Sequence, residues 1–218
     1  MTKLSPETRD KLKTVSTATL ATALFKRGLR NQFIQNVHPL RARKETMVGE
    51  AFTLRYIPAR EDLNPLTVFR DRAHPQRQAV EQCPPGAVLV MDSRKDPRAA
   101  SAGSILVTRL MVRGVAGVVT DGGFRDSAEI AALDINVPIG CGDVAVWPGD
   151  VVAGDADGVI IVPAAIADEI AAEAVEMTAF EDFVTERVQG GQSILGLYPP
   201  TDEANLAAFE AWRKAKGR

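Results

Sequence analysis

The sequence predicts an α/β fold in which helices are layered on one central β-sheet, and three observations lead to this prediction. A strand at Ala87–Met91, a helix at Ser104–Arg113 and a strand at Ala116–Thr120 follow one another along the chain. This order is typical of a βαβ unit, in which parallel strands are joined by a right-handed crossover. The apolar runs Val151–Ala153 and Gly158–Val162 are separated by a Gly-Asp turn, which favours two neighbouring strands. Helical patterns at both ends of the chain complete the α/β interpretation.

The first half of the chain is expected to contain three more helices and another strand. Ser5 can cap a helix that has proline at its first position, because the serine oxygen accepts from free amides and proline has no amide to satisfy. The expected elements are a helix from Pro6, a helix over Thr17–Lys26 ended by Gly28, a strand over Gly49–Ile57, a loop over Pro58–Pro75 and a short helix over Gln76–Gln82.

The last third is expected to be mainly helical. We expect a short strand within Asp134–Cys141, a long amphipathic helix from Pro163 to Val188 that ends at Gly190, and a final helix from Asp202. In this final helix Leu206, Phe209 and Trp212 share one side, which is typical of packing residues. Since we find no repeat or linker, residues 1–218 are predicted to form a single domain.

Composition excludes several classes of protein. The 218 residues are 45% hydrophobic and 25% charged, with a net charge of −2, so the chain shows no basic surface for a nucleic acid. It has no apolar run of about 20 residues that would span a membrane. Its first residues lack the apolar core of a signal peptide, and Cys83 and Cys141 lack metal-ligand spacing. We therefore expect a cytoplasmic protein with reduced thiols and with neither nucleic acid nor membrane as partner.

The first candidate for a binding site is a helix start at Gly103. Glycine lets a ligand approach the main chain closely, and the free amides of Ser104, Ile105 and Leu106 would attract an anion. The alternative is an ordinary helix cap made by Ser101 or Ser104.

The second candidate follows the strand that ends at Thr120. The loop runs from Asp121 through two glycines to Arg125 and Asp126, and it should lie at the carboxyl edge of the sheet, where ligands bind in open α/β folds. Arginine offers a planar fork to a carboxylate, and aspartate offers a hard oxygen to a divalent cation. A surface salt bridge is the alternative. Because the helix start and this loop flank the same βα unit, both can reach one pocket, which predicts a site that holds a small 2-oxo acid against a metal.

These segments resemble the RraA-like family. Its enzymatic branch contains the 4-hydroxy-4-methyl-2-oxoglutarate / 4-carboxy-4-hydroxy-2-oxoadipate aldolases. The resemblance covers roughly residues 12–198, and the spacing from Gly103 to Asp126 is its specific part. The matching positions are Gly103, Arg113–Val119, Asp121-Gly122, Arg125-Asp126 and Glu129, with Val15–Ala18, Val48–Ala51, Pro148–Val152 and Gly154–Ile160.

The resemblance implies an RraA-like domain that assembles as a homotrimer or as a hexamer built from two trimers, with active sites between subunits. It further implies that Asp126 binds Mg²⁺ or Mn²⁺ with Glu129 as a supporting carboxylate, and that Arg125 holds the pyruvyl group. The amides of Ile105 and Leu106 would receive the substrate carboxylate. The implied function is a divalent-metal-dependent lyase, a class II type aldolase or an oxaloacetate-decarboxylase-like enzyme, that cleaves a C–C bond of a small 2-oxo acid through a metal-stabilised pyruvate enolate.

One position departs from the aldolase pattern. The aldolases usually place an acid directly after the helix glycine, and this chain has Ser104. Loss of that carboxylate would weaken metal binding or change proton transfer. Three alternatives therefore stay open: a hydrolase or dehydratase that acts on an oxo sugar acid, a non-catalytic regulator that binds a ribonuclease, and a structural oligomer without a ligand.

The remaining polar candidates are expected to have mainly structural roles. Glu181 and Glu186 would lie on a solvated helix face or reach the metal of a neighbouring subunit, and Asp92 and Asp96 would make a turn or line the mouth of the pocket. The others are Asp155 and Asp157 in a tight turn, and His38 and His74 as isolated histidines.

Overall fold

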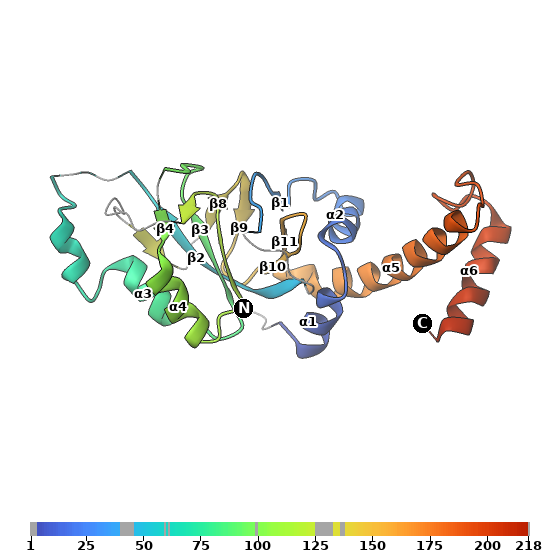
Figure 1. Cartoon of the computed structure of the whole chain (residues 1–218), viewed down its shortest axis with the longest axis horizontal. Helices are drawn as coiled ribbons and strands as arrows, with labels where there is room; N and C mark the ends of the chain where they lie inside the picture. The colour runs from blue at the N-terminus through green and yellow to red at the C-terminus, as the bar shows by residue number, and fades with distance from the viewer. Residues whose placement is uncertain are drawn as a thin grey trace.

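An α/β body and a helical arm that extends from it make up the protein (Figure 1). This computed structural model describes residues 4–39, 46–58, 60, 62–98, 100–124, 133–135 and 138–217. The helices in this part of the chain are α1 (Pro6–Lys13), α2 (Thr17–Lys26), α3 (Pro75–Gln82), α4 (Ser104–Val112), α5 (Ala167–Gln189) and α6 (Glu203–Lys216), with 3₁₀ turns η1 (Leu66–Arg70) and η2 (Ala164–Ile166).

A mixed sheet crosses the body in the order β1-β11-β10-β2-β3-β5, and β7 pairs with the far end of β2. The strand β3 runs parallel to both β2 and β5, and the other pairs in this sheet are antiparallel. The strands are β1 (Phe33–Ile34), β2 (Met47–Tyr56), β3 (Val88–Asp92), β4 (Ala100–Ala102), β5 (Gly117–Thr120), β6 (Gly123–Phe124), β7 (Leu133–Ile135), β8 (Ile139–Cys141), β9 (Val144–Val146), β10 (Val151–Gly154) and β11 (Val159–Val162).

The predicted βαβ unit is confirmed as β3, α4 and β5. Its first strand, β3, lies between β2 and β5 and is buried on both faces, as its continuous apolar sequence indicates. Leu89 and Met91 face α3 and α4, whereas Val88 and Val90 face the hairpin of β8 and β9. Because β3 and β5 are parallel, the loops that follow them leave the sheet at the same edge.

A second layer of helices covers the other half of the sheet. The helices α1, α2 and the first half of α5 bury a cluster against β10 and β11, with Leu12, Leu20 and Ile170 among its members. Ser5 caps α1 as predicted and accepts from the amide of Thr8, and Ser16, which was not predicted as a cap, accepts from the amide of Thr19 at the start of α2. The two cysteines are free and buried.

The arm is an antiparallel pair of helices, the second half of α5 and α6, which lies beyond the sheet (Figure 1). Phe183 is fully buried there, with its ring centroid 5.5 Å from that of Phe209 and 5.8 Å from that of Trp212. The indole of Trp212 also donates to Glu186 at 2.7 Å. The prediction that Phe209 and Trp212 pack is therefore confirmed within one chain, while Leu206 keeps 43% of its surface exposed.

Truncation of the central ring of the arm is expected to release α6. Phe183→Ala should lower the free energy of unfolding of the arm by about 3–5 kcal/mol, because a buried aromatic side chain is replaced by a cavity. Denaturant titration with Trp212 fluorescence measures this loss, since this indole lies in the cluster. Leu195→Ala is the matched control in the same arm, because Leu195 is 85% exposed and should change stability little. Equal effects of the two substitutions would contradict the assigned packing.

Three expected elements differ from the structure. The predicted strand within Asp134–Cys141 is two separate strands, β7 and β8, which pair with β2 and β9 respectively. Pro138 lies just before β8 and lacks the amide that a continuous ladder would need. The expected loop over Pro58–Pro75 contains the 3₁₀ turn η1, and the long helix begins at Ala167 after the 3₁₀ turn η2.

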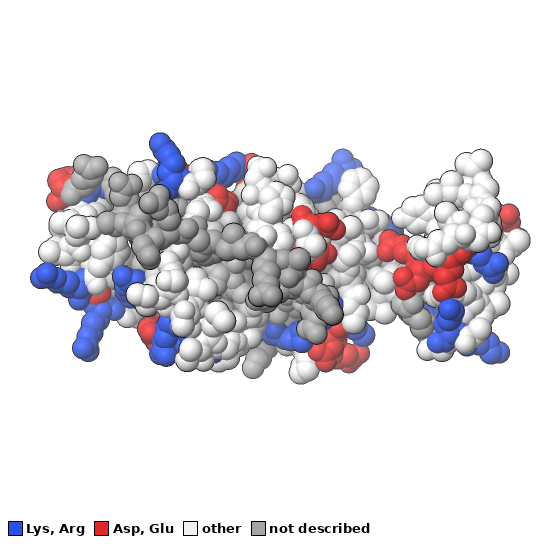
Figure 2. Space-filling view, viewed as in Figure 1, with Lys and Arg blue, Asp and Glu red and all other residues white. Residues whose placement is uncertain are grey.

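Charges of both signs are interspersed over the described part of the face shown in Figure 2, and acidic side chains gather on the arm. None of the helices that the structure describes is both long and apolar enough to cross a membrane.

Candidate functional site

The carboxyl edge of β3 and β5 brings together the segments from which the predicted site is built. After β3, the chain turns through Ser93–Arg98 into the short strand β4, which leads directly to Gly103 and α4. After β5, the chain passes Asp121 and Gly122 and forms β6. β4 and β6 pair in parallel, with Ala100 opposite Gly123 and Ala102 opposite Phe124. Gly103 directly follows Ala102 in the sequence, and Arg125 directly follows Phe124.

The amino end of α4 has the form expected of an anion site. Gly103 is the N-cap residue with extended backbone, φ −104° and ψ 177°, and no side chain caps the helix. Ser104 is exposed, Ile105 keeps 80% of its surface exposed and Leu106 is half-buried. Amides in the first turn of a helix have no partner within the helix, and among the described residues none is found to accept from these three N–H groups, so they are candidates for binding an anion.

The alternative role of Ser101 as a helix cap is wrong, because its hydroxyl belongs to a buried cluster. The Ser101 hydroxyl lies 2.6 Å from the hydroxyl of Ser93 and 2.6 Å from that of Thr120. The hydroxyls of Ser93 and Thr120 lie 3.1 Å apart, and the Thr120 oxygen also accepts from the amide of Gly122 at 3.0 Å. This hydroxyl cluster joins the ends of β3, β4 and β5 beneath the site.

Gly122 is required by this close approach. A Cβ atom at this position would lie 2.5 Å from the Cβ atom of Ser93 and 3.1 Å from the Ser101 hydroxyl. Any other residue would push β6 away from the hydroxyl cluster. The double glycine in the sequence thus has a steric reason at its first position.

Asp121 is a functional candidate that the sequence indicated only as part of a motif. Its carboxylate accepts three backbone N–H groups, from Ser93 at 2.6 Å, from Lys95 at 3.2 Å and from Gly142 at 3.1 Å. The first two belong to the loop after β3 and the third to the turn between β8 and β9. The sequence signal was an Asp-Gly pair directly after a strand, but its partners are 21 to 28 residues away and could not be read from local spacing.

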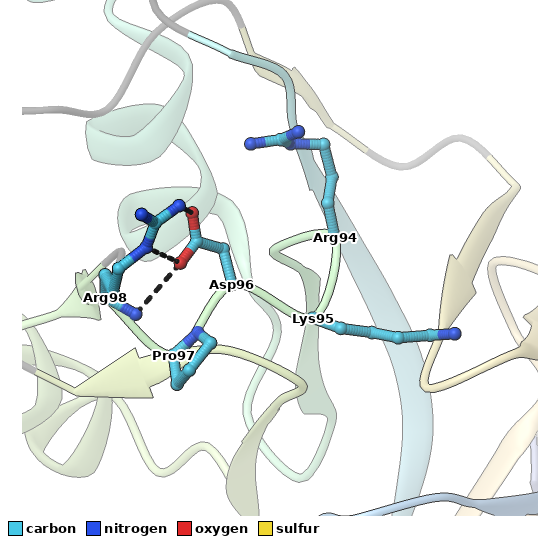
Figure 3. A pocket seen from close by; sticks show the side chains of 5 residues that line it. All are labelled: Arg94, Lys95, Asp96, Pro97 and Arg98. Carbon is cyan, nitrogen blue, oxygen red and sulfur yellow. Dashed lines mark hydrogen bonds and ion pairs between the residues drawn. The ribbon is translucent and has the colours of Figure 1, made fainter.

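A basic hollow lies beside this carboxylate. It has a volume of about 410 Å³ and is lined by Arg94, Lys95, Asp96, Pro97 and Arg98 (Figure 3). Asp96 receives two hydrogen bonds from the Arg98 guanidinium and one from the Arg98 amide, whereas the side chains of Arg94 and Lys95 point away from it. Asp96 thus has the turn role expected as one alternative, and it also lines this hollow.

Asp92 has the turn role that was the alternative. Its carboxylate accepts from the amide of Arg94 at 2.9 Å and is 8% exposed. Burial raises the pKa of the Asp92 carboxyl, the hydrogen bond from Arg94 opposes this rise, and the neighbouring Asp121 charge adds to it.

Arg125, Asp126 and Glu129 lie outside the described residues. The described part of the chain contains no group of three or more His, Cys, Asp or Glu side chains that could hold a metal ion. The two metal ligands that the sequence predicts, Asp126 and Glu129, both have carboxylate side chains. Carboxylate oxygens are the donors that Mg²⁺ and Mn²⁺ prefer. Metal binding by Asp126 and Glu129 stays a prediction.

The remaining polar candidates are engaged in packing and turns. Glu181 accepts from the hydroxyl of Thr19 at 2.9 Å, and Glu186 binds Trp212 and Lys216 of α6. Both glutamates thus have partners within their own chain. Asp155 accepts from Thr17 and from the amide of Asp157, and His74 packs on Phe69, so both have structural positions, whereas His38 is a surface residue.

The comparison with known proteins fits this arrangement. The family model described as RraA-like (Aldolase/RraA) matches residues 17–137, which include β3, α4, β5 and the Arg125-Asp126 pair. The chain belongs to the RraA-like family. The predicted family is therefore confirmed, and the RraA-like match covers the site from β3 to the Arg125-Asp126 pair, with Gly142 just beyond it.

Relatives and solved structures agree with this family assignment. A Halalkalibacterium halodurans protein that is provisionally named 4-hydroxy-4-methyl-2-oxoglutarate aldolase is 36% identical over 106 residues, 39% of this chain and 50% of that protein. The chain thus spans about half the length of this relative. A protein of Paraburkholderia phytofirmans with the same provisional name is 31% identical over 153 residues, 61% of this chain and 85% of that protein.

The fold is that of solved RraA proteins. Streptomyces coelicolor RraAS2, described as an unusual member of the RNase ES inhibitor RraA protein family, superposes with a TM-score of 0.69 at 25% identity and covers 84% of this chain and 98% of its own. An uncharacterized Pseudomonas syringae protein superposes with a TM-score of 0.76 at 21% identity, over 90% of this chain and 95% of its own. These superpositions confirm the predicted α/β fold class.

Proposed function

We propose that this RraA-like protein is a divalent-metal-dependent lyase that cleaves a C–C bond of a small 2-oxo acid and releases pyruvate. The observation that carries the proposal is the parallel pairing of β4 with β6, with Ala102 opposite Phe124. Because of this pairing, two segments begin side by side at one edge of the sheet. One is the uncapped amino end of α4, which follows Ala102, and the other is the segment that carries Arg125 and Asp126, which follows Phe124. The aldolase names of two relatives point to the same chemistry.

In this proposal the substrate carboxylate binds at the amino end of α4. The amides of Ile105 and Leu106 donate to it, and the helix dipole favours its negative charge. The Ile105 side chain is 80% exposed, so the ligand can reach the main chain without displacing core residues. Binding at this point holds the substrate at the sheet edge where β4 and β6 pair.

Arg125 and Asp126 act on the reacting end of the substrate. Cleavage leaves negative charge on the former keto oxygen, and the Arg125 guanidinium stabilises that charge where it develops. Asp126, supported by Glu129, would hold Mg²⁺ or Mn²⁺, which when bound supplies further positive charge at the same oxygen. A water molecule beside Arg125 would take the proton from the substrate hydroxyl as the neighbouring C–C bond breaks and a carbonyl forms, and return of a proton to the enolate carbon would release pyruvate.

A second candidate function is regulation of a ribonuclease through protein binding. The similarity to RraAS2, a member of an RNase inhibitor family, favours it. Ser104 also favours it, because the aldolases usually have an acid directly after the helix glycine. Retention of the Arg125-Asp126 pair favours the enzyme, since binding of a protein does not require this pair.

A coupled assay tests the proposed reaction. The protein is mixed with Mg²⁺ or Mn²⁺ and each of a panel of 4-hydroxy-2-oxo acids and oxaloacetate, and released pyruvate is followed with lactate dehydrogenase and NADH. We expect turnover that stops when EDTA removes the metal. Lack of pyruvate from every acid, with no effect of EDTA, would overturn the lyase proposal and favour the regulator or a hydrolase of oxo sugar acids.

A further inference from the structure

The geometry points to Asp121 as the positioning residue of the candidate site, which it would organise by tying two loops to the segment that leads to Arg125 and Asp126. This inference rests on the proposed function. Both carboxylate oxygens of Asp121 already accept backbone amides, Oδ1 from Ser93 and Oδ2 from Lys95 and Gly142. The carboxylate is therefore placed to act through these loops, while the chemistry belongs to other groups.

The loops that Asp121 holds have a backbone conformation that costs free energy. Arg94 and Lys95 both have φ of +58°, and Asp143, next to Gly142, has φ of +66°. Residues with a Cβ atom rarely adopt this left-handed region, and they persist there only when surrounding bonds enforce it. Asp121 accepts the amide of Lys95, which is itself strained, and the amide of Gly142, which precedes the strained Asp143. The amide of the third strained residue, Arg94, is accepted by Asp92.

Asp121 also fixes the start of the segment that carries the proposed catalytic pair. Gly122 passes against Ser93, where a Cβ atom would lie only 2.5 Å from the Cβ atom of that serine. Gly123 and Phe124 then pair with β4, which leads to Gly103. Asp121 anchors one end of this run and the β-pairing holds the other, so the backbone of Gly122–Phe124 is fixed relative to β4 and the start of α4.

An asparagine at this position would break the arrangement without changing its size. Three N–H donors converge on the two oxygens of Asp121, and the amide nitrogen of asparagine would meet one or more of these donors with hydrogens of its own. At least one amide would then lose its acceptor. Because a small displacement of reacting groups can lower turnover about 10²-fold, the effect should fall on kcat.

Asp150 provides a matched control for this substitution. Its carboxylate also accepts two backbone N–H groups, from Trp147 at 2.9 Å and from Ala164 at 3.2 Å. The next residue, Val151, pairs with Glu50 of β2. The residue after Glu50, Ala51, pairs with Val88, the first residue of β3. Asp150 is therefore at the opposite edge of the sheet from Asp121, where loss of similar bonds cannot reach the site directly.

The experiment compares Asp121→Asn and Asp150→Asn in the pyruvate assay, in thermal unfolding and in amide hydrogen exchange. Both substitutions should lower Tm by roughly 3–8 °C. Only Asp121→Asn should lower kcat, by about tenfold or more, while KM stays within about twofold because the α4 amides are intact. It should also speed exchange at the amides of Ser93, Lys95 and Gly142.

The outcomes separate this inference from the function on which it rests. If Asp121→Asn loses as much Tm as Asp150→Asn but keeps the kcat of the wild type, Asp121 is only structural and the inference is overturned. If the wild-type protein releases no pyruvate, the proposed function fails and hydrogen exchange alone decides. Faster exchange at Gly122 together with the three bonded amides then supports the positioning role, and exchange unchanged from wild type overturns it.

Discussion

Asp126→Ala is expected to reduce metal-dependent pyruvate release by about 10³-fold in kcat/KM. A cation that stabilises charge at the keto oxygen contributes several kcal/mol to the transition state, and each 1.36 kcal/mol is about a tenfold change in rate. Removal of the carboxylate that would hold the ion removes this contribution. The measurement is the lactate-dehydrogenase-coupled assay over a range of Mn²⁺ concentrations, in which the variant should also need far more metal to reach half of its maximal rate.

A pair of arginine variants tests the other half of the proposed machinery. Arg125→Ala should lower kcat/KM to a similar extent, and Arg125→Lys should recover only a small part, because an ammonium cannot reproduce the planar fork of the guanidinium. Asp62→Ala is the control, since Asp62 is an exposed carboxylate paired with Arg60 in the expected loop after β2. Wild-type rates in both Asp126→Ala and Arg125→Ala would show that the reaction does not use this pair.

The part of the site that was predicted from the sequence is the part that local physics determines. Glycine before an apolar helical run predicted the uncapped start of α4, and apolar runs of the right length predicted β3 and β5. Each of these signals lies within the element that it specifies. The parallel pairing followed from the order of the elements, because a strand, a helix and a strand in succession favour one crossover.

The contacts that join these elements were not predicted, because they depend on residues far apart in the sequence. The strands β4 and β6 have three and two residues, too few for a periodic pattern, yet their pairing brings Gly103 beside the segment before Arg125. The hydroxyls of Ser93, Ser101 and Thr120 likewise meet only when the ends of three strands converge. Their sequence neighbourhoods resemble those of ordinary turn residues.

Ile105→Pro is expected to raise KM for the 2-oxo acid by about 10- to 150-fold while the fold is kept. Proline removes one backbone N–H that would bind the substrate carboxylate, and hydrogen bonds to charged groups contribute about 1.5–3 kcal/mol. The first turn of a helix tolerates proline because its amides have no partner within the helix. The Ile105 side chain is 80% exposed, so its loss costs little packing.

Ile105→Ala separates the amide from the side chain. It keeps the backbone N–H and removes the same exposed surface, so its KM should stay close to that of the wild type. Circular dichroism and Tm establish that α4 is intact in both variants. If proline and alanine raise KM equally, the substrate carboxylate does not bind at the amino end of α4, and the 2-oxo acid must be held elsewhere along the sheet edge, where the hollow lined by Arg94, Lys95 and Arg98 offers basic side chains.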